Sequence, residues 1–388
     1  MSTVRKLRDL AIVAAGQGAP QGEENYCTNG IPFIKAGNLI ELLNGKKERD
    51  IQNVSEEVAK QYRLKLYPAG TVLFAKSGMS CMKGYVYVLQ SDCYVVSHLA
   101  CIIPIETTGA YLKYYFEYHR PNSLIKDEAY PSISLSDIGN LDIRLETPVK
   151  QAAIVNNLDR INALIKCRKA QLHKIDDLVK SQFIEMFGAV GADEKGWGLI
   201  ALGECCELNP KKSDDDRLKE GVEVSFVPMP AVTEKGELDN SSIRLYEQVQ
   251  KGFTYFADND VLFAKITPCM ENGKGAVARG LKNGIGFGST EFHVLRPKAG
   301  VSNPVWLYTI MSFKQFRQDA ARKMTGSAGQ RRVPSSFLSG YKVSLPPIAL
   351  QNQFAIFVER TDKSKFRIKQ SLEKLEKCYK ALLQKYFG

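Results

Sequence analysis

We expect neither a membrane-spanning segment nor a secretory signal peptide from this sequence. Met1 to Leu10 contains Arg5, Lys6 and Arg8 in place of a long apolar core, so we do not expect it to be a secretory signal peptide. Elsewhere no uninterrupted apolar run reaches the roughly 18 residues that a membrane-spanning helix requires. The four histidines and nine cysteines do not occur at the spacings typical of zinc ligands. We therefore expect a cytoplasmic protein with reduced cysteines and no metal site.

Motifs of the common nucleotide-dependent enzymes are also missing. Gly45-Lys46 and Gly273-Lys274 lack the upstream glycine and the following serine or threonine of a phosphate-binding loop. Asn209-Pro210-Lys211-Lys212 lacks the aromatic residue with which adenine methyltransferases stack a flipped base. No glycine-rich loop suited to S-adenosylmethionine stands out. We therefore predict that this chain has no catalytic residues and binds no cofactor.

Composition and charge favour a folded protein with a polyanionic partner. The chain has 388 residues, of which 44% are hydrophobic and 24% charged, as is typical of a globular protein with more than one domain. The 53 lysines and arginines outnumber the 42 acidic residues, so the formal net charge is +11. A positive field attracts phosphate backbones and raises the rate of encounter with nucleic acid.

The sequence contains an internal repeat that divides it into two similar halves. The segment 145–188 returns as 345–388 without a gap, at an offset of 200 residues, so that Gln151 matches Gln351. A shorter match precedes it, because VLFAK occurs at both 72–76 and 261–265. Such a repeat indicates two copies of one structural unit. We predict a pseudo-twofold α+β fold of four segments: a first domain (1–147), a first long helix (148–188), a second domain (189–345) and a second long helix (346–388).

Each repeated segment is predicted to form one long helix with an apolar seam. Apolar residues recur at alternating steps of four and three, which is typical of a coiled coil, whereas the alternative is an ordinary bundle helix. Pro148 precedes the first helix, and Pro346 and Pro347 precede the second. Equivalent helices related by a pseudo-twofold axis must run antiparallel. The seam is interrupted by Arg168, Gln182, Thr361 and Lys365 and otherwise contains Ile154, Leu158, Ile161, Ile165, Leu172, Ile175 and Val179 in the first helix and Phe354, Val358, Ile368, Leu372, Leu375, Tyr379 and Leu382 in the second.

The segments between the long helices mix strands with shorter helices. Asn303-Pro304 predicts the start of a helix that continues to about Arg322. Gly109–His119 takes the same place in the first half. Runs rich in β-branched and aromatic residues, broken by glycine loops, predict strands at 223–229, 260–266, 275–279 and 291–296.

Polar loops that carry lysine, arginine and amide side chains are candidates for contact with DNA. Glycine in such loops permits close approach of the backbone to a ligand. Arginine can bind guanine, and glutamine adenine, through two hydrogen bonds. For each loop the alternative is a solvated hairpin tip. The candidates are Lys76, Ser77, Ser80 and Lys83 in the first half, Lys265, Thr267, Asn272 and Lys274 in the second, and Gln330, Arg331 and Arg332 in the loop GSAGQRR at 326–332.

The order of variable domain, long helix, variable domain and long helix resembles the specificity subunits of type I restriction-modification enzymes. LFAKITPCMENGK (262–274) and VSLPPIALQ (343–351) are similar to segments of that family's target-recognition domains. In the first half, Glu128–Ser134 stands in place of the basic loop 326–332.

The resemblance implies that each domain reads one half of an asymmetric, two-part sequence in double-stranded DNA. It also implies that the long helices set the separation of the half-sites and dock methyltransferase subunits, which use S-adenosylmethionine. Restriction subunits that use ATP can join such complexes.

Two other function classes remain as alternatives. A stand-alone DNA-binding regulator would bind DNA without methyltransferase subunits and would not need long apolar seams. A fused nuclease or methyltransferase is disfavoured by the missing motifs. We therefore predict a non-catalytic subunit that reads DNA and does not associate with membranes.

Overall fold

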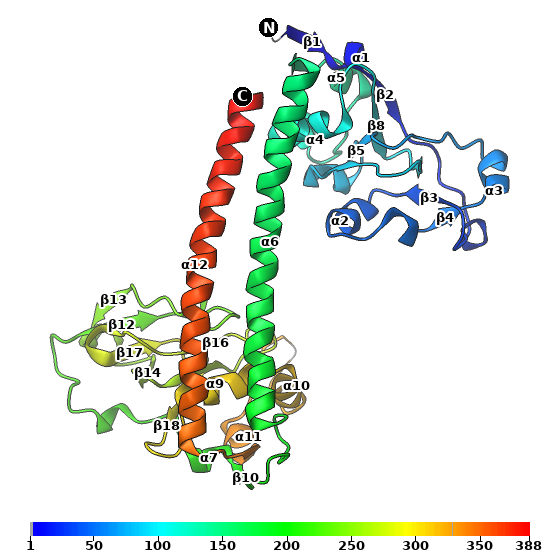
Figure 1. Ribbon diagram of the computed structural model, residues 1–388. Coiled ribbons are helices and arrows are strands. Elements are labelled where there is room, and N and C mark those ends of the chain that lie inside the picture. The colour runs from blue at the N-terminus through cyan, green and yellow to red at the C-terminus, as the bar shows by residue number, and fades with distance from the viewer. Residues whose placement is uncertain (1–2, 328) are drawn as a thin grey trace. The chain divides into compact units, whose positions relative to one another are not determined.

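The computed structural model describes residues 3–327 and 329–388 of the chain (Figure 1). The chain forms two compact units. Unit 1 comprises Met1–Arg168 with Ser371–Gly388, and unit 2 comprises Lys169–Gln370. Both units mix helices with mainly antiparallel strands, which confirms the predicted α+β class. Each long helix contributes to both units, and the predicted division into four segments stays a prediction.

Unit 1 is built on a four-stranded sheet of order β2-β8-β5-β6 and a three-stranded sheet of order β4-β3-β7. The helix α4 packs on the larger sheet, where the ring centroids of Phe116 and Phe74 are 4.9 Å apart. Its elements are β1 (Thr3–Lys6), α1 (Leu7–Leu10), β2 (Ala11–Ala15), β3 (Ile31–Ile34), α2 (Asn38–Leu43), β4 (Asn53–Val54), α3 (Glu56–Gln61), β5 (Val72–Ala75), η3 (Met79–Lys83), β6 (Val86–Val88), β7 (Tyr94–Val95), β8 (Leu99–Pro104), α4 (Gly109–Tyr118), α5 (Leu135–Gly139) and β9 (Asp142–Leu145).

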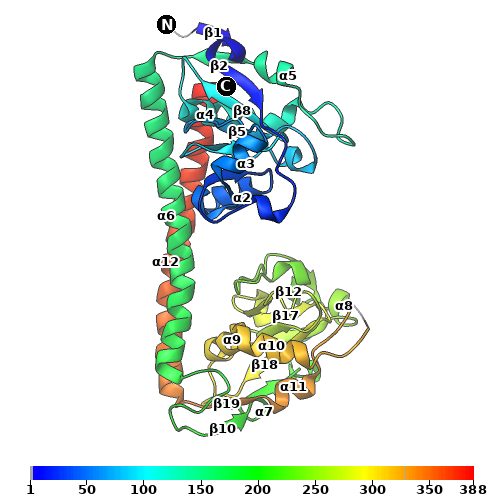
Figure 2. The same cartoon turned by 90° about the vertical axis from the view of Figure 1, so that its right-hand side faces the viewer.

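Unit 2 repeats this plan with sheets of order β11-β18-β15-β16 and β13-β12-β17-β14. The helix α9 packs against the strand β18 of the first of these sheets, as Figure 2 shows. Its elements are β10 (Leu199–Ala201), α7 (Leu202–Cys205), β11 (Cys206–Leu208), β12 (Glu223–Val227), β13 (Ile243–Leu245), α8 (Tyr246–Val249), β14 (Thr254–Ala257), β15 (Val261–Ala264), β16 (Gly275–Val277), β17 (Ile285–Gly288), β18 (Phe292–Pro297), α9 (Pro304–Ser312), α10 (Lys314–Arg322), α11 (Ser335–Gly340) and β19 (Lys342–Ser344).

The internal repeat of the sequence is also a repeat of backbone hydrogen bonds. The amide of Leu7 donates to the carbonyl of Leu141 at 2.9 Å, and the amide of Leu202 donates to that of Tyr341 at 2.8 Å. The strand pair β1–β9 of unit 1 corresponds to β10–β19 of unit 2. The prediction of two similar halves is therefore confirmed.

The two long helices, α6 (Pro148–Phe187) and α12 (Ile348–Phe387), each contain 40 residues. In unit 2 the Nζ of Lys365 lies 2.6 Å from a carboxylate oxygen of Asp176. In the same unit the rings of Phe183 and Phe354 are 5.4 Å apart. Because higher numbers in one helix face lower numbers in the other, the helices run antiparallel, as predicted.

The predicted seam faces inward along both helices. Leu158 and Phe354 are fully buried, and Ile154 and Ile165 are 7% exposed. Every other predicted apolar seam residue is partly buried. These residues are Ile161, Leu172, Ile175 and Val179 in α6 and Val358, Ile368, Leu372, Leu375, Tyr379 and Leu382 in α12.

The last turns of the helices bury aromatic residues that the seven-residue repeat does not predict. Phe183 and Phe187 belong to the core of unit 2 together with Trp306. Phe387 belongs to the core of unit 1, where its ring lies 5.2 Å from that of Tyr111. At these ends the helices pack on a globular core as well as on each other, so the buried face widens beyond the seam.

A buried glutamine anchors the first turn of each long helix. The Nε2 of Gln151 donates to the carbonyl of Glu146 at 2.8 Å, and its Oε1 accepts from the Thr107 hydroxyl at 2.9 Å. The Nε2 of Gln351 donates to the carbonyl of Pro346 at 2.8 Å, and its Oε1 accepts from the backbone N–H of Asn303 at 2.9 Å. Both side chains thus fasten a helix start to the polypeptide before it.

The single helix predicted from Asn303 to Arg322 is wrong, because two helices occupy this segment. The Oδ1 of Asn303 accepts from the amide of Val305 at 2.8 Å, so the predicted cap is correct. Phe313 then has φ −70° and ψ 140°, which is extended backbone, and it separates α9 from α10. Its ring lies 5.2 Å from that of Phe183, so packing against α6 favours the break.

The burial of Phe354 predicts a strong effect of shortening its side chain. We expect Phe354→Ala to lower the free energy of unfolding by about 3–5 kcal/mol, because a fully buried ring leaves a cavity. Ile356 is 52% exposed on the same helix, and Ile356→Ala should cost less than about 1 kcal/mol. Urea unfolding of the full chain measures both variants, and equal losses would contradict the proposed packing.

Candidate nucleic-acid interface

Two candidate loops of unit 2 lie side by side. The amide of Val333 donates to the carbonyl of Lys265 at 2.9 Å, and the amide of Thr267 donates to that of Arg331 at 3.0 Å. The Thr267 hydroxyl reinforces the pairing, since it donates to the carbonyl of Gly329 at 3.1 Å. The loop after β15 and the loop before α11 therefore form one polar edge. Ala328, within the predicted loop 326–332, lies outside the described residues.

The two arginines of this edge are held differently. Arg332 makes a two-pronged ion pair with Glu291, in which Nε donates at 2.9 Å and Nη2 at 2.8 Å. These bonds stabilise the carboxylate and hold the pKa of Glu291 below its ordinary value. Arg331 is more exposed and makes a single 3.3 Å contact with Glu271. The ion pair of Arg332 therefore holds the loop in place, whereas Arg331 can leave its single contact and bind a ligand.

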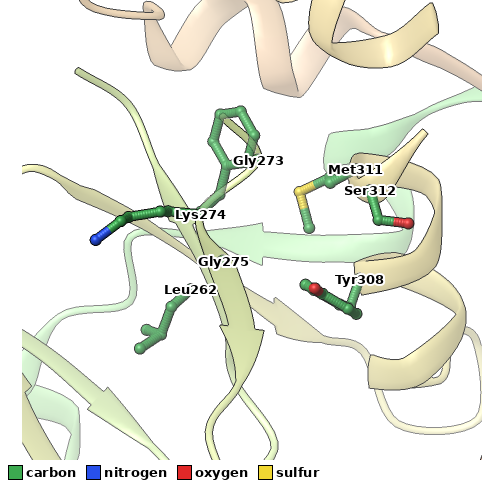
Figure 3. A pocket seen from close by; sticks show the side chains of 8 residues that line it. Leu262, Gly273, Lys274, Gly275, Tyr308, Met311 and Ser312 are labelled. Carbon is green, nitrogen blue, oxygen red and sulfur yellow. The ribbon is translucent and has the colours of Figure 1, made fainter. Parts of the chain in front are cut away.

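The remaining candidates of unit 2 differ in their exposure. Asn272 and Gln330 are exposed, whereas Lys265 is partly buried. Lys274 is also partly buried, and its Nζ lies 3.4 Å from the carbonyl oxygen of Met229. Figure 3 shows its side chain extending away from Tyr308. Lys274 thus connects its loop to a neighbouring segment of the same unit and must break this contact to reach a phosphate.

His293 is a buried residue that contacts the backbone of this edge. Its side chain is 6% exposed, and its Nε2 lies 2.8 Å from the carbonyl oxygen of Val333. The Nδ1 faces the Nδ2 of Asn209 at 3.3 Å, so a neutral ring that donates from Nε2 satisfies both contacts. Burial lowers the pKa of His293, which favours this neutral form. The histidine therefore has a structural role at this edge.

Unit 1 builds the same edge from different side chains. The amide of Ile133 donates to the carbonyl of Lys76 at 2.7 Å, and the amide of Gly78 donates to that of Pro131 at 3.0 Å. These bonds correspond to the two that join the loops of unit 2. The segment 128–134 therefore does occupy the place of the basic loop 326–332.

The edge of unit 1 carries fewer basic side chains than the edge of unit 2. Ser77 takes part in a hydrogen bond of 2.8 Å with Nδ1 of His98. His98 occupies the position that Glu291 has in unit 2. Lys83 is exposed, while Lys76 and Ser80 are partly buried. Ser132 stands at the position of Arg332. The edge of unit 1 therefore lacks the arginine–glutamate ion pair that holds the loop of unit 2.

The arginines of the edge were predictable from the sequence, but their acidic partners were not. Glu271 and Glu291 lie 60 and 41 residues from Arg331 and Arg332 along the chain. Glu271 lies in the candidate loop itself, close to Lys274. An acidic residue within a basic loop was the signal that could have indicated an ion pair. Glu291 lies between the strands β17 and β18, and nothing in the sequence around it indicates an arginine partner.

Within residues 3–327 and 329–388, no helix is long and apolar enough to span a bilayer. In the same part of the chain, no three histidine, cysteine, aspartate or glutamate side chains gather as a candidate metal site.

A sequence profile described as the type I restriction modification DNA specificity domain matches residues 2–175 and 194–377. The chain belongs to this family. The two matched ranges correspond to the two halves of the internal repeat, so the chain contains two specificity domains.

Curated members of the family share substantial identity with part of the chain. The EcoAI specificity subunit of Escherichia coli is 41% identical over 164 residues, which are 42% of this chain and 27% of that protein. The EcoEI subunit of the same organism is 40% identical over 167 residues, or 41% of this chain and 27% of that protein. The MjaIX subunit of Methanocaldococcus jannaschii is 30% identical over 190 residues, or 44% of this chain and 43% of that protein. The chain therefore spans less than half the length of these relatives.

Solved structures resemble the fold over the whole chain. The S subunit of a type I restriction-modification system from M. genitalium has a TM-score of 0.59 and 15% identity, covering 100% of this chain and 96% of that one. A chain from work on complex assembly and conformational transition of the type I R-M system has a TM-score of 0.57 and 15% identity, covering 100% and 97%. At this identity the likeness concerns the fold.

The neutral, buried His293 predicts a pH dependence of stability. Its folded pKa is below the ordinary value of 6.5, so its contribution is present above that pH and is lost as the pH falls below it. We expect His293→Gln to flatten the pH dependence between pH 7.5 and 5.5, by at most about 1.4 kcal/mol per pH unit. His173→Gln, on the exposed side of α6, is the control. Denaturant unfolding at several pH values measures the effect, and identical profiles for both variants would contradict it.

The different settings of the two arginines predict separable effects on DNA binding. We expect Arg331→Ala, and the double variant with Arg332→Ala, to weaken binding by about 1–3 kcal/mol if Arg331 reads a base. A phosphate contact would instead weaken all sequences alike and reduce the salt dependence. Glu271→Gln, which frees Arg331, should not weaken binding. Titration of labelled duplexes measures these affinities, and an unchanged affinity of the double variant at moderate salt would place this edge away from DNA.

Proposed function

We propose that this chain is the specificity subunit of a type I restriction-modification complex and reads an asymmetric, two-part sequence in double-stranded DNA. The observation that carries the proposal is one polar edge built twice, with the same backbone hydrogen bonds and different side chains. Equal scaffolds place two edges in equivalent positions on their units, and unequal side chains give each edge its own base preference.

The proposed role is non-catalytic, so the chemistry belongs to partners. Methyltransferase subunits would supply S-adenosylmethionine and modify adenine, and restriction subunits would supply ATP-dependent cleavage. The sequence supports this division, because it has no recognisable loop for either cofactor. We propose that the complex acts in the cytoplasm on chromosomal and incoming DNA.

The exposed faces of the long helices are the proposed docking surface for partner subunits. Arg160, Lys174 and Lys180 of α6 return as Arg360, Lys374 and Lys380 of α12, and all six are exposed. A repeated surface presents the same contacts twice and suits two copies of one partner. The seam residues, in contrast, are used inside the chain.

The long helices are proposed to act as a spacer, which an insertion can test. Seven residues inserted between Lys169 and Ala170, and seven between Ser371 and Leu372, keep the seam in phase and lengthen each helix by about 10 Å. This length corresponds to roughly three base pairs. We expect unchanged half-site sequences and a longer unread spacer. Mapping of N6-methyladenine in a genome that carries the chain and its methyltransferase partner measures both.

Two controls accompany the double insertion. The pure chain, incubated with S-adenosylmethionine and DNA, should transfer no methyl group, whereas its complex should do so. Insertion into α6 alone puts the two seams out of register and should abolish methylation. Because three base pairs rotate the groove by roughly 100°, activity of the double insertion can fall. An active double insertion with altered half-sites and an unaltered spacer would refute the spacer role.

A further inference from the structure

Two large apolar side chains are exposed on the polar edge of unit 1. Tyr130 is 82% exposed and Met79 is 72% exposed. Burial of such side chains against a partner is favourable, so two of them on a candidate interface favour an apolar contact there. Neither residue is among the DNA contacts that the sequence predicts.

The backbone places these two residues directly beyond the last hydrogen-bonded positions of the two loops. Ser77 and Ser132 form an antiparallel bridge, and the amide of Gly78 donates to the carbonyl of Pro131 at 3.0 Å. Met79 and Tyr130 are the residues next to this bonded pair, and the 3-10 helix η3 begins at Met79. Both therefore lie where the two loops of the edge come together.

The equivalent positions of unit 2 carry no such pair. Its bridge joins Ile266 and Arg332, so the positions two residues from the bridge are Pro268 and Gln330. An amide that can donate and accept hydrogen bonds thus takes the place of the phenol ring. The two edges therefore differ in polarity at this matched position as well as at the positions of the two arginines.

The surroundings of Tyr130 indicate which groove of DNA it suits. Asp127 and Glu128 are exposed on the same loop, and Lys126 is engaged by Asp137 at 2.8 Å. Carboxylates are repelled by phosphates, and the narrow minor groove has the stronger negative potential. The wide major groove admits such a loop more easily and displays the C5-methyl group of thymine.

We propose that Tyr130 and Met79 are specificity-determining residues that contact thymine methyl groups in the half-site read by unit 1. This inference rests on the proposed function, because it requires sequence-specific binding to DNA. Thymine is the base that an apolar side chain distinguishes in the major groove, since its methyl group is the apolar feature of the base edges. Unit 1 then reads by apolar contact where unit 2 reads by hydrogen bonds.

The experiment combines a protein change with the removal of single methyl groups from DNA. After the recognised sequence has been mapped, duplexes carry deoxyuridine in place of one thymine at a time in both half-sites. The full chain, in complex with its methyltransferase partner, should bind at least one substituted duplex about fourfold more weakly, since a buried methyl group contributes about 0.8 kcal/mol. Tyr130→Ala should weaken binding to the unsubstituted duplex and lose the penalty at that thymine. Because Tyr130 is exposed, this variant should fold normally.

Matched variants make the outcome specific to unit 1. Met79→Ala should reduce the penalty at the same or an adjacent thymine, whereas Gln330→Ala should leave it intact. If no duplex is bound specifically by the unaltered complex, the proposed function itself fails. If specific binding occurs but deoxyuridine has no effect, or if Tyr130→Ala keeps the full penalty, the contact with thymine methyl groups is overturned.

Discussion

Each unit depends on a helix segment that comes from a distant part of the chain. Phe387 completes the core of unit 1, where it contacts Tyr111. Phe354 is fully buried in unit 2 between Phe183 and Phe187. Because both long helices take part in both cores, the antiparallel pairing is a condition for two complete units. The polar edges are positioned only after these cores have formed.

Much of the fold was predictable from the sequence, because its main signals are periodic or local. The seam recurs at regular steps, so the burial of Leu158 and Phe354 followed from spacing alone. The cap at Asn303 followed from a local preference. The break at Phe313 did not, since it depends on a ring contact with Phe183 from a distant helix. Phe187 and Phe387 were missed because their partners are cores rather than the other seam.

The candidate site was predictable in its location and less so in its chemistry. Matched loops in two halves identified both edges, and the structure joins the loops of each edge by equivalent hydrogen bonds. The pairing of Arg332 with Glu291 was not predictable, because it requires the register between a strand approach and a loop far away in sequence. The exposure of Tyr130 likewise depends on how the backbone around Pro131 is held.

The discontinuous make-up of the units has a consequence for synthesis of the protein. The chain emerges from the ribosome N-terminus first. The core of unit 1 is therefore incomplete until Phe387 has emerged. Unit 2, whose residues are contiguous from Lys169 to Gln370, can close earlier. The part synthesised first is therefore completed last, and its sheet must wait with the apolar surface around Tyr111 uncovered. During this interval the nascent chain exposes a hydrophobic face, which makes it prone to aggregation.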